Sequence, residues 1–165
     1  MDREEERRNE LLDRGMVLFF MEGISAFTME GLAARLGVSK RTLYKYYPKK
    51  ELFVDAAAQR MLDKVRGQIE AHLATESEFP QRLKGFFMIV QTTLQPAARL
   101  LVRDIMTAAP WLWEKVSRYR HDKIFSLLEG LLDEGRAKGY IRSDIEPRLI
   151  APLFIGMIEQ VAQPA

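Results

Sequence analysis

The stretch that decides the fold is residues 28–50, TMEGLAARLGVSKRTLYKYYPKK. It predicts two short helices joined by a tight turn at Gly37, because glycine ends a helix in the left-handed conformation without a steric penalty. Thr28 and Ser39 are suited to cap the two helices, since a hydroxyl oxygen accepts a hydrogen bond from a first-turn backbone N–H. Pro48 ends the second helix, because proline is excluded from a helix interior and disfavours a helical residue before it.

The second helix of this hairpin carries Lys40 and Arg41 in its first turn. Leu43 and Tyr47 are four residues apart and are expected to face inward, which leaves residues 44–46 on the outer faces. Cations in a first turn oppose the helix dipole, so they cost stability unless an anion faces them. The hairpin holds six basic residues and one acidic residue, a net +5, in a chain of formal net charge +2. This concentration indicates a surface that binds DNA; the alternative is an ordinary solvated helical hairpin.

The segment LAARLGVSKRTLYKYYPKKELF, residues 32–53, closely resembles the helix-turn-helix signature of TetR-type (tetracycline-repressor-like) transcriptional regulators. The preceding RNELLDRGMVLFFMEGISAFTME resembles the first helix of that family and the turn that follows it. The resemblance covers roughly residues 7–55 and beyond them is one of helical pattern only. It implies a two-fold dimer that binds a palindromic operator on double-stranded DNA, usually as a repressor released by a small molecule.

The resemblance also implies which side chains meet DNA. Lys40, Arg41 and Thr42 match the first turn that faces the groove, Tyr44 and Tyr46 match positions that touch backbone or bases, and Thr28 and Lys50 match helix starts that contact phosphates. With the Ser39 cap, the expected DNA-binding residues are Thr28, Ser39, Lys40, Arg41, Thr42, Tyr44, Tyr46 and Lys50. Position 46 is often His in the family and position 41 is often small, so the operator sequence stays open.

The remaining sequence predicts helices throughout and an all-α fold of about eight helices. A helix is expected over residues 3–21 and another over 49–74, and Pro80, Pro96, Pro110 and Pro147 each open a further one, with Gly139 ending the third of these. No run of alternating β-branched residues favours a strand. We expect a three-helix DNA-binding domain over residues 1–48 and a helical regulatory and dimerisation domain over residues 49–165.

A ligand site in the second domain is expected mainly from the resemblance. Aromatic and Met side chains suit an apolar or amphipathic effector, and an Arg could pair with its acid group. The candidate residues are Phe86, Phe87, Met88, Arg103, Met106, Trp113 and His121. The alternative is that the aromatic residues are plain core and the arginines are solvated. We hypothesise that an occupied site moves the helix over residues 49–74 and changes the separation of two recognition helices.

A homodimer is expected because two recognition helices must reach successive major grooves. The last two predicted helices carry more apolar residues than one chain needs to bury inwardly. The candidate interface residues are Leu127, Leu128, Leu131, Phe154 and Ile158. The chain ends soon after them, where family members usually continue with a further helix, so a short member, a truncated chain and an abbreviated dimer face all remain open.

Other classes of protein find little support in the composition. The chain has no cysteine, and His72 and His121 are its only histidines, too far apart to form a local ligand pair. No HExxH, GxSxG or phosphate-binding glycine loop occurs, so we expect no enzyme, cofactor or metal site. The charged N-terminus is not a signal peptide and residues 149–158 are too short to span a bilayer, which favours the cytoplasm. Two alternatives remain: a helix-turn-helix protein whose second domain binds a protein partner, and a helical interaction protein that no longer reads DNA.

Overall fold

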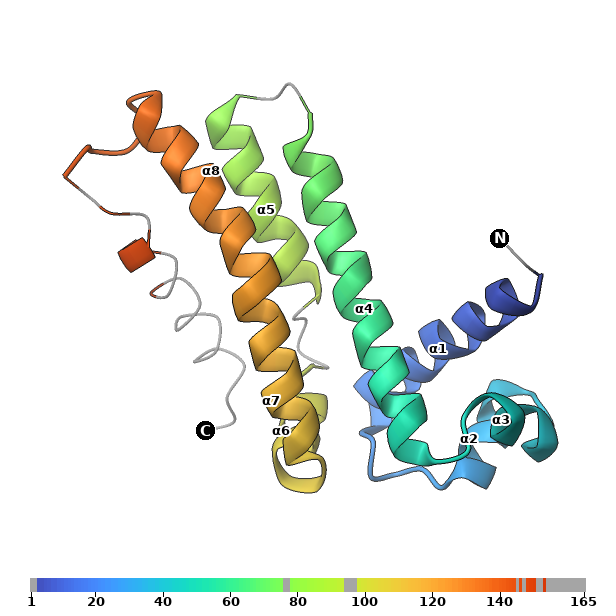
Figure 1. Ribbon diagram of the computed structural model, residues 1–165. Coiled ribbons are helices and arrows are strands. Elements are labelled where there is room, and N and C mark those ends of the chain that lie inside the picture. Colours follow the sequence, from blue (N-terminus) through green and yellow to red (C-terminus); the bar gives the residue numbers. More distant parts are fainter. Residues whose placement is uncertain are drawn as a thin grey trace. The chain divides into compact units, whose positions relative to one another are not determined.

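The computed structural model describes residues 3–75, 78–93, 98–144, 146, 148–150 and 153, and every regular element within them is helical. The elements are α1 (Arg3–Glu22), α2 (Met29–Leu36), α3 (Lys40–Tyr46), α4 (Lys50–Leu73), α5 (Phe79–Thr93), α6 (Ala98–Ala108), α7 (Pro110–Tyr119), the π-helical turn η1 (Arg120–Phe125) and α8 (Ser126–Ala137) (Figure 1). The all-α prediction is confirmed.

The helices pack into two compact units, each with its own apolar core. The first unit takes in Met1–Asp63 and Ala97–Val116, and the second takes in Lys64–Pro96 and Ser117–Ala165. The first unit therefore holds α1 to α3, the first half of α4, α6 and most of α7. The predicted functional division after residue 48 stays a prediction, while the packing places α6 beside α1.

The core of the first unit is built where α1, α3 and α4 meet. The Phe53 ring of α4 is fully buried and lies edge-on to Phe19 of α1 and to Tyr47, with ring centroids 6.0 and 5.0 Å apart. Gly15 of α1 permits this packing, because a Cβ there would lie 2.4 Å from Phe53 Cε1. The short α2 adds Leu32, and its neighbours Ala33 and Leu36, to the same core.

A second connection within the first unit joins α6 to the turn between α1 and α2. The backbone N–H and the hydroxyl of Ser25 donate to the two carboxylate oxygens of Asp104, each over 2.7 Å. Gly23, which opens the turn, has φ +83° and faces the same carboxylate. The turn that leads into α2 is thus held by a side chain of α6.

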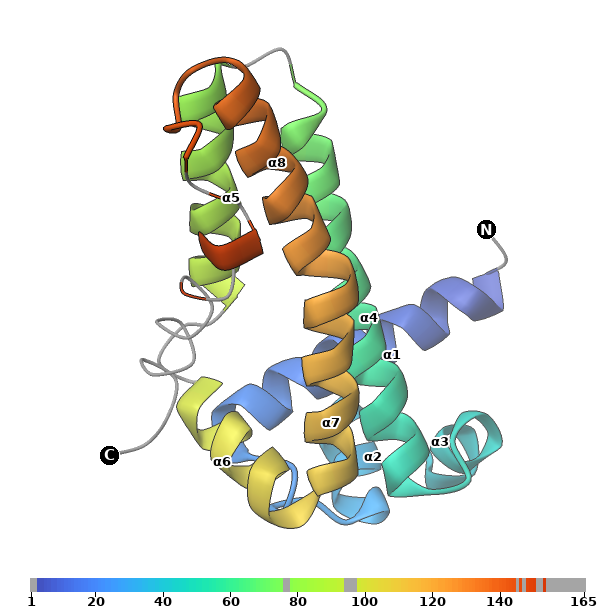
Figure 2. The same cartoon turned by 60° about the vertical axis from the view of Figure 1, so that its left-hand side comes forward.

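In the second unit, α5 lies beside α8 in both Figure 1 and Figure 2. Gly135 lets the Phe79 ring approach α8, since a Cβ there would lie 2.3 Å from Phe79 Cε2. Arg82 of α5 donates to both oxygens of Glu134 at 2.6 and 2.5 Å, and Lys138 reaches the same carboxylate at 2.8 Å. These hydrogen bonds, that from Lys138 first, lower the pKa of Glu134.

Most predicted helix boundaries agree with the structure. α5 begins at Phe79, one residue before the proline, and α7, η1 and α8 follow without a break from Pro110 to Ala137. Gly139 comes next with φ +79°, as expected of a residue that ends a helix. The proline predicted to open the sixth helix lies outside the described residues, and of the last predicted helix only 148–150 and 153 are described, all helical.

Candidate nucleic-acid interface

The hairpin of α2 and α3 has the capped ends that the sequence predicts. Thr28 Oγ1 accepts from the Gly31 N–H at 3.1 Å, so the start of α2 is capped. Gly37 ends α2 with φ +69°, and the N–H groups of Gly37 and Val38 return to the carbonyls of residues 34 and 33 at 3.1 and 3.0 Å. The reversal between the helices is therefore fixed by local hydrogen bonds.

Ser39 caps α3 in the same manner, since its Oγ accepts from the Thr42 N–H at 3.0 Å. The hydroxyls of Ser39 and Thr42 also lie 2.8 Å apart and share a hydrogen bond. Both residues were predicted to touch DNA, and both already act in shaping the first turn of α3. Ser39 is exposed and Thr42 is half-buried.

The inner face of α3 holds the helix against α1 and α4. Leu43 is fully buried, and Tyr47, which follows the last residue of α3, is 2% exposed. Arg8 of α1 donates from Nε to the Tyr47 hydroxyl at 2.9 Å, and this hydrogen bond raises the pKa of Arg8. Because a buried ring and a hydrogen bond fix α3, its outer side chains project from a rigid base.

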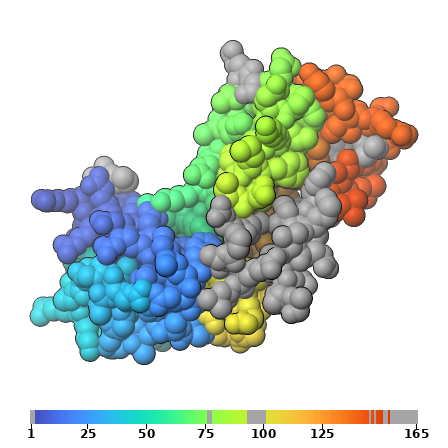
Figure 3. All heavy atoms as spheres, turned by 180° about the vertical axis from the view of Figure 1, so that it is seen from behind, coloured from blue at the N-terminus to red at the C-terminus, as the bar shows by residue number. Residues whose placement is uncertain are grey.

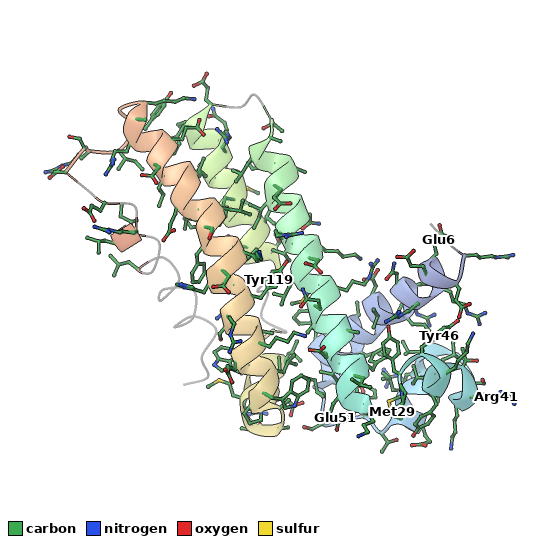
Figure 4. All side chains as sticks on the ribbon, viewed as in Figure 1. Glu6, Met29, Arg41, Tyr46, Glu51 and Tyr119 are labelled. Carbon is green, nitrogen blue, oxygen red and sulfur yellow. The ribbon has the colours of Figure 1, made fainter. Side chains whose placement is uncertain are left out.

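The first turn of α3 presents Lys40 and Arg41 to solvent. Both side chains are exposed, and Arg41 extends outward from α3 in Figure 4. Within the part of the chain that the structure describes, neither residue has an ion pair or a hydrogen bond from its side chain. Two cations without a carboxylate partner at the positive end of a helix favour an anion from outside the chain.

The later residues of α3 differ, because acidic groups of the same unit bind them. The Tyr44 hydroxyl donates to Glu30 Oε1 at 3.1 Å, which raises the pKa of Tyr44. Lys45 Nζ donates to Glu4 Oε1 at 2.8 Å and lies 5.3 Å from the centroid of the Tyr46 ring. The outer surface of α3 is thus open at its first turn and partly occupied at its last.

All eight predicted DNA-binding residues belong to the first unit, at the surface of α2, α3 and the start of α4. Thr28 is exposed, and Lys50, the first residue of α4, is half-buried. In Figure 3 the segment from α1 to α3, drawn blue to cyan, forms one continuous face. The structure therefore places the predicted residues together, and their contact with DNA remains a prediction.

Sequence reasoning missed the acidic partners that reduce the basic charge of this surface. Arg35 was counted among the free cations, but both of its terminal nitrogens bind the Glu22 carboxylate, one over 3.0 Å and the other closer. Arg60 of α4 likewise pairs with Asp13 of α1 at 2.8 Å. No local spacing could reveal these pairs, since they join residues on different helices.

The predicted ligand residues are divided between the two units. Arg103, Met106 and Trp113 belong to the first unit, and the other four belong to the second: Phe86, Phe87, Met88 and His121. Phe86 is 2% exposed and is a core residue, whereas Met88 is 52% exposed. His121 lies edge-on to Phe125 within η1 and the start of the following helix, with centroids 5.5 Å apart. A role in ligand binding remains a prediction for the set.

The prediction that Leu128 and Leu131 face a second chain does not fit their position. They are 1% and 3% exposed in the core of the second unit, where α4, α5 and η1 also contribute. Leu127 is half-buried beside that core. Phe154 and Ile158 lie outside the described residues. A helix face that is already buried within its own chain offers no surface for dimerisation.

The described residues contain no grouping of three or more His, Cys, Asp or Glu side chains that could hold a metal ion. Among the helices described, none combines the length and apolarity needed to cross a bilayer.

Known proteins share both the sequence pattern and the fold. Residues 11–57 match the family model of bacterial regulatory proteins of the tetR family. The chain is 28% identical over 141 residues to the HTH-type transcriptional regulator YvaF of Bacillus subtilis, covering 84% of this chain and 73% of the relative. It is 26% identical over 153 residues to the HTH-type transcriptional repressor DhaR of Mycobacterium sp., covering 90% and 76%.

The solved structure of the fatty acid degradation regulator FadR from Bacillus halodurans has the same fold, with a TM-score of 0.76 at 19% identity, covering 94% of this chain and 82% of that one. The matched family segment contains α2, α3 and the residues that cap them, and the relatives are regulators of transcription rather than enzymes. The chain is therefore a helix-turn-helix transcriptional regulator of the TetR family.

Proposed function

We propose that this regulator binds a palindromic operator as a homodimer, with the first turn of α3 in the major groove. The observation that carries the proposal is the pair Lys40 and Arg41, exposed and without an acidic partner among the described residues, on a helix whose opposite face is buried. A cation at a rigid helix surface can reach a guanine edge or a phosphate, whereas a mobile one loses more entropy on binding. Thr28 and Lys50 would contact flanking phosphates.

We further propose that the chain is a repressor that a small apolar or amphipathic molecule releases from DNA. The name of the relative DhaR supports repression. The partly exposed Phe87 and Met88 of α5 support an apolar effector, because Met and aromatic side chains adapt to varied apolar shapes. Effector binding would act on DNA affinity through α4, which begins beside the recognition hairpin at Lys50 and continues to Leu73 in the second unit.

The test is selection of binding sites from a random pool of DNA duplexes at two salt concentrations. A palindromic consensus is expected, with half-sites one helical turn or a multiple of a turn apart. That consensus then serves as the probe for effectors that lower affinity. Weak binding that salt abolishes and that shows no sequence preference would contradict the proposal.

A further inference from the structure

The two ends of α3 differ in how their cations are compensated. Lys40 and Arg41 have no carboxylate partner among the described residues, whereas Lys45 pairs with Glu4 of α1 at 2.8 Å. The Lys45 and Glu4 side chains are 64% and 54% exposed, so water and other ions reach both. An ion pair this exposed is weak and can exchange partners.

Glu4 holds more than the ammonium group. The hydrogen bond and charge of Lys45 lower the pKa of Glu4, and a hydrogen bond from Tyr46 lowers it further. Lys45 also lies over the Tyr46 ring, so the three side chains form one cluster at the end of α3. A carboxylate that accepts from an ammonium and a phenol occupies the donors that a phosphate would use.

We propose that Glu4 is an internal substitute for a DNA phosphate, which binds Lys45 and Tyr46 in the free protein and gives them up to the DNA backbone. This inference rests on the proposed function, since it assumes that α3 approaches DNA. It adds Lys45 to the side chains that contact phosphate and gives the N-terminal turn of α1 a role in setting affinity.

The exchange has a cost that the sequence of α1 determines. DNA binding breaks the Glu4–Lys45 pair, and the released carboxylate is left near phosphates of the same sign. Exposed pairs of this kind contribute a few tenths to about 1 kcal/mol, which corresponds to about a two- to five-fold change in affinity. Glu4→Gln keeps the size of the side chain and removes this competition, so it should tighten binding by that factor.

Glu6 provides the matched control. It lies in the same first turn of α1, is exposed, and has no ion pair within the described residues (Figure 4). Glu6→Gln removes the same charge at the same helix end, so it reports the general repulsion between α1 and DNA. The excess of the Glu4→Gln effect over the Glu6→Gln effect measures the competition for Lys45.

The experiment measures dissociation constants by fluorescence anisotropy for the full chain on two duplexes, the selected operator and a scrambled one, at several salt concentrations. Both duplexes are used because a phosphate contact does not depend on sequence. We expect Glu4→Gln to tighten binding to both by about two- to five-fold and Glu6→Gln to tighten it less. Lys45→Ala should lower the salt slope by about one unit, and Glu4→Gln should lose most of its effect in that background.

Equal effects of Glu4→Gln and Glu6→Gln would overturn the inference, as would a Glu4→Gln gain that persists unchanged in Lys45→Ala. An unaltered salt slope in Lys45→Ala would also overturn it. Failure of the proposed function looks different: the two duplexes would bind equally in the wild type while the excess effect of Glu4→Gln remained. Absence of binding to either duplex would overturn both.

Discussion

Gly15 is expected to be indispensable to the packing of the recognition unit, and Gly15→Ala tests this. The Cβ of an alanine would lie 2.4 Å from Cε1 and 2.5 Å from Cζ of Phe53. The Phe53 ring is fully buried and already lies edge-on to two other rings, so it cannot move without disturbing them. One of these belongs to Tyr47, which follows α3 directly.

Two opposing terms set the size of the effect. An added methyl in a well-packed core costs about 1–3 kcal/mol. Alanine in a helix interior is favoured over glycine by about 1 kcal/mol. Gly15→Ala should therefore lower the free energy of unfolding by roughly 0–2 kcal/mol, or shift Tm downward by up to several degrees at about 2–4 °C per kcal/mol. Gly31→Ala is the control, because its Cβ meets only Thr28 Oγ1 at 3.4 Å, an ordinary contact.

Tryptophan fluorescence is a suitable assay, because both tryptophans of the chain, Trp111 and Trp113, belong to the first unit. Thermal unfolding should show a lower Tm for Gly15→Ala than for Gly31→Ala. In a Phe53→Leu background, which removes the ring atoms that clash, Gly15→Ala should become neutral or stabilising. Equal Tm values for the two glycine variants, or the same loss with Leu at position 53, would refute the packing argument.

Three further expectations concern stability. Gly37→Ala should cost about 1–2 kcal/mol from backbone strain alone, because φ is +69° and no atom lies within 4 Å of the added Cβ; Gly37→Asn should cost less in the same thermal assay, and equal losses would argue against strain. Asp104→Ala should cost about 1 kcal/mol by removing both hydrogen bonds from Ser25, and an unchanged tryptophan transition would contradict that role. The pKa of Glu134 is lowered from its usual 4.5, so its contribution to stability is present above that pH and lost as pH falls through the lowered value. Glu134→Gln should therefore flatten the decline of Tm between about pH 5 and pH 3, and an unaltered pH profile would contradict it.

Local features of the recognition hairpin were predictable because they depend on neighbouring residues. The caps at Thr28 and Ser39, the left-handed Gly37 and the inward positions of Leu43 and Tyr47 each follow from spacings of four residues or fewer. The structure reproduces all five. The helix-turn-helix could therefore be derived before any tertiary contact was known.

The compensation of charge could not be derived in the same way. Glu4 and Lys45 are 41 residues apart, and Ser25 and Asp104 are 79 apart. Their contacts exist only once α1, α3 and α6 have packed together. A count of charges along the chain therefore overstated the basic surface, because it could not show that Arg35 is paired with Glu22.

The error at Leu128 and Leu131 has a different cause. The apolar face of the last long helix was judged wider than one chain could bury, but residues of α4 and α5 cover it. The π-helical turn η1 contributes too, since one extra residue per turn rotates the following face by about 100° relative to a regular helix. A stripe assigned at constant spacing from Pro110 onward therefore misplaces the leucines after η1.

The most direct test of the central claim compares Arg41→Ala with Lys50→Ala on the selected operator and on a set of duplexes with single base-pair changes. If α3 reads bases through its first turn, Arg41→Ala should relax preference at one position of each half-site, with a loss of about 1–3 kcal/mol on the best sequence. Lys50→Ala should weaken all duplexes about equally and lower the salt slope by about one unit. An equal loss on every duplex for Arg41→Ala would place this residue on phosphate and contradict base reading, and no loss on any duplex would contradict the α3 interface itself.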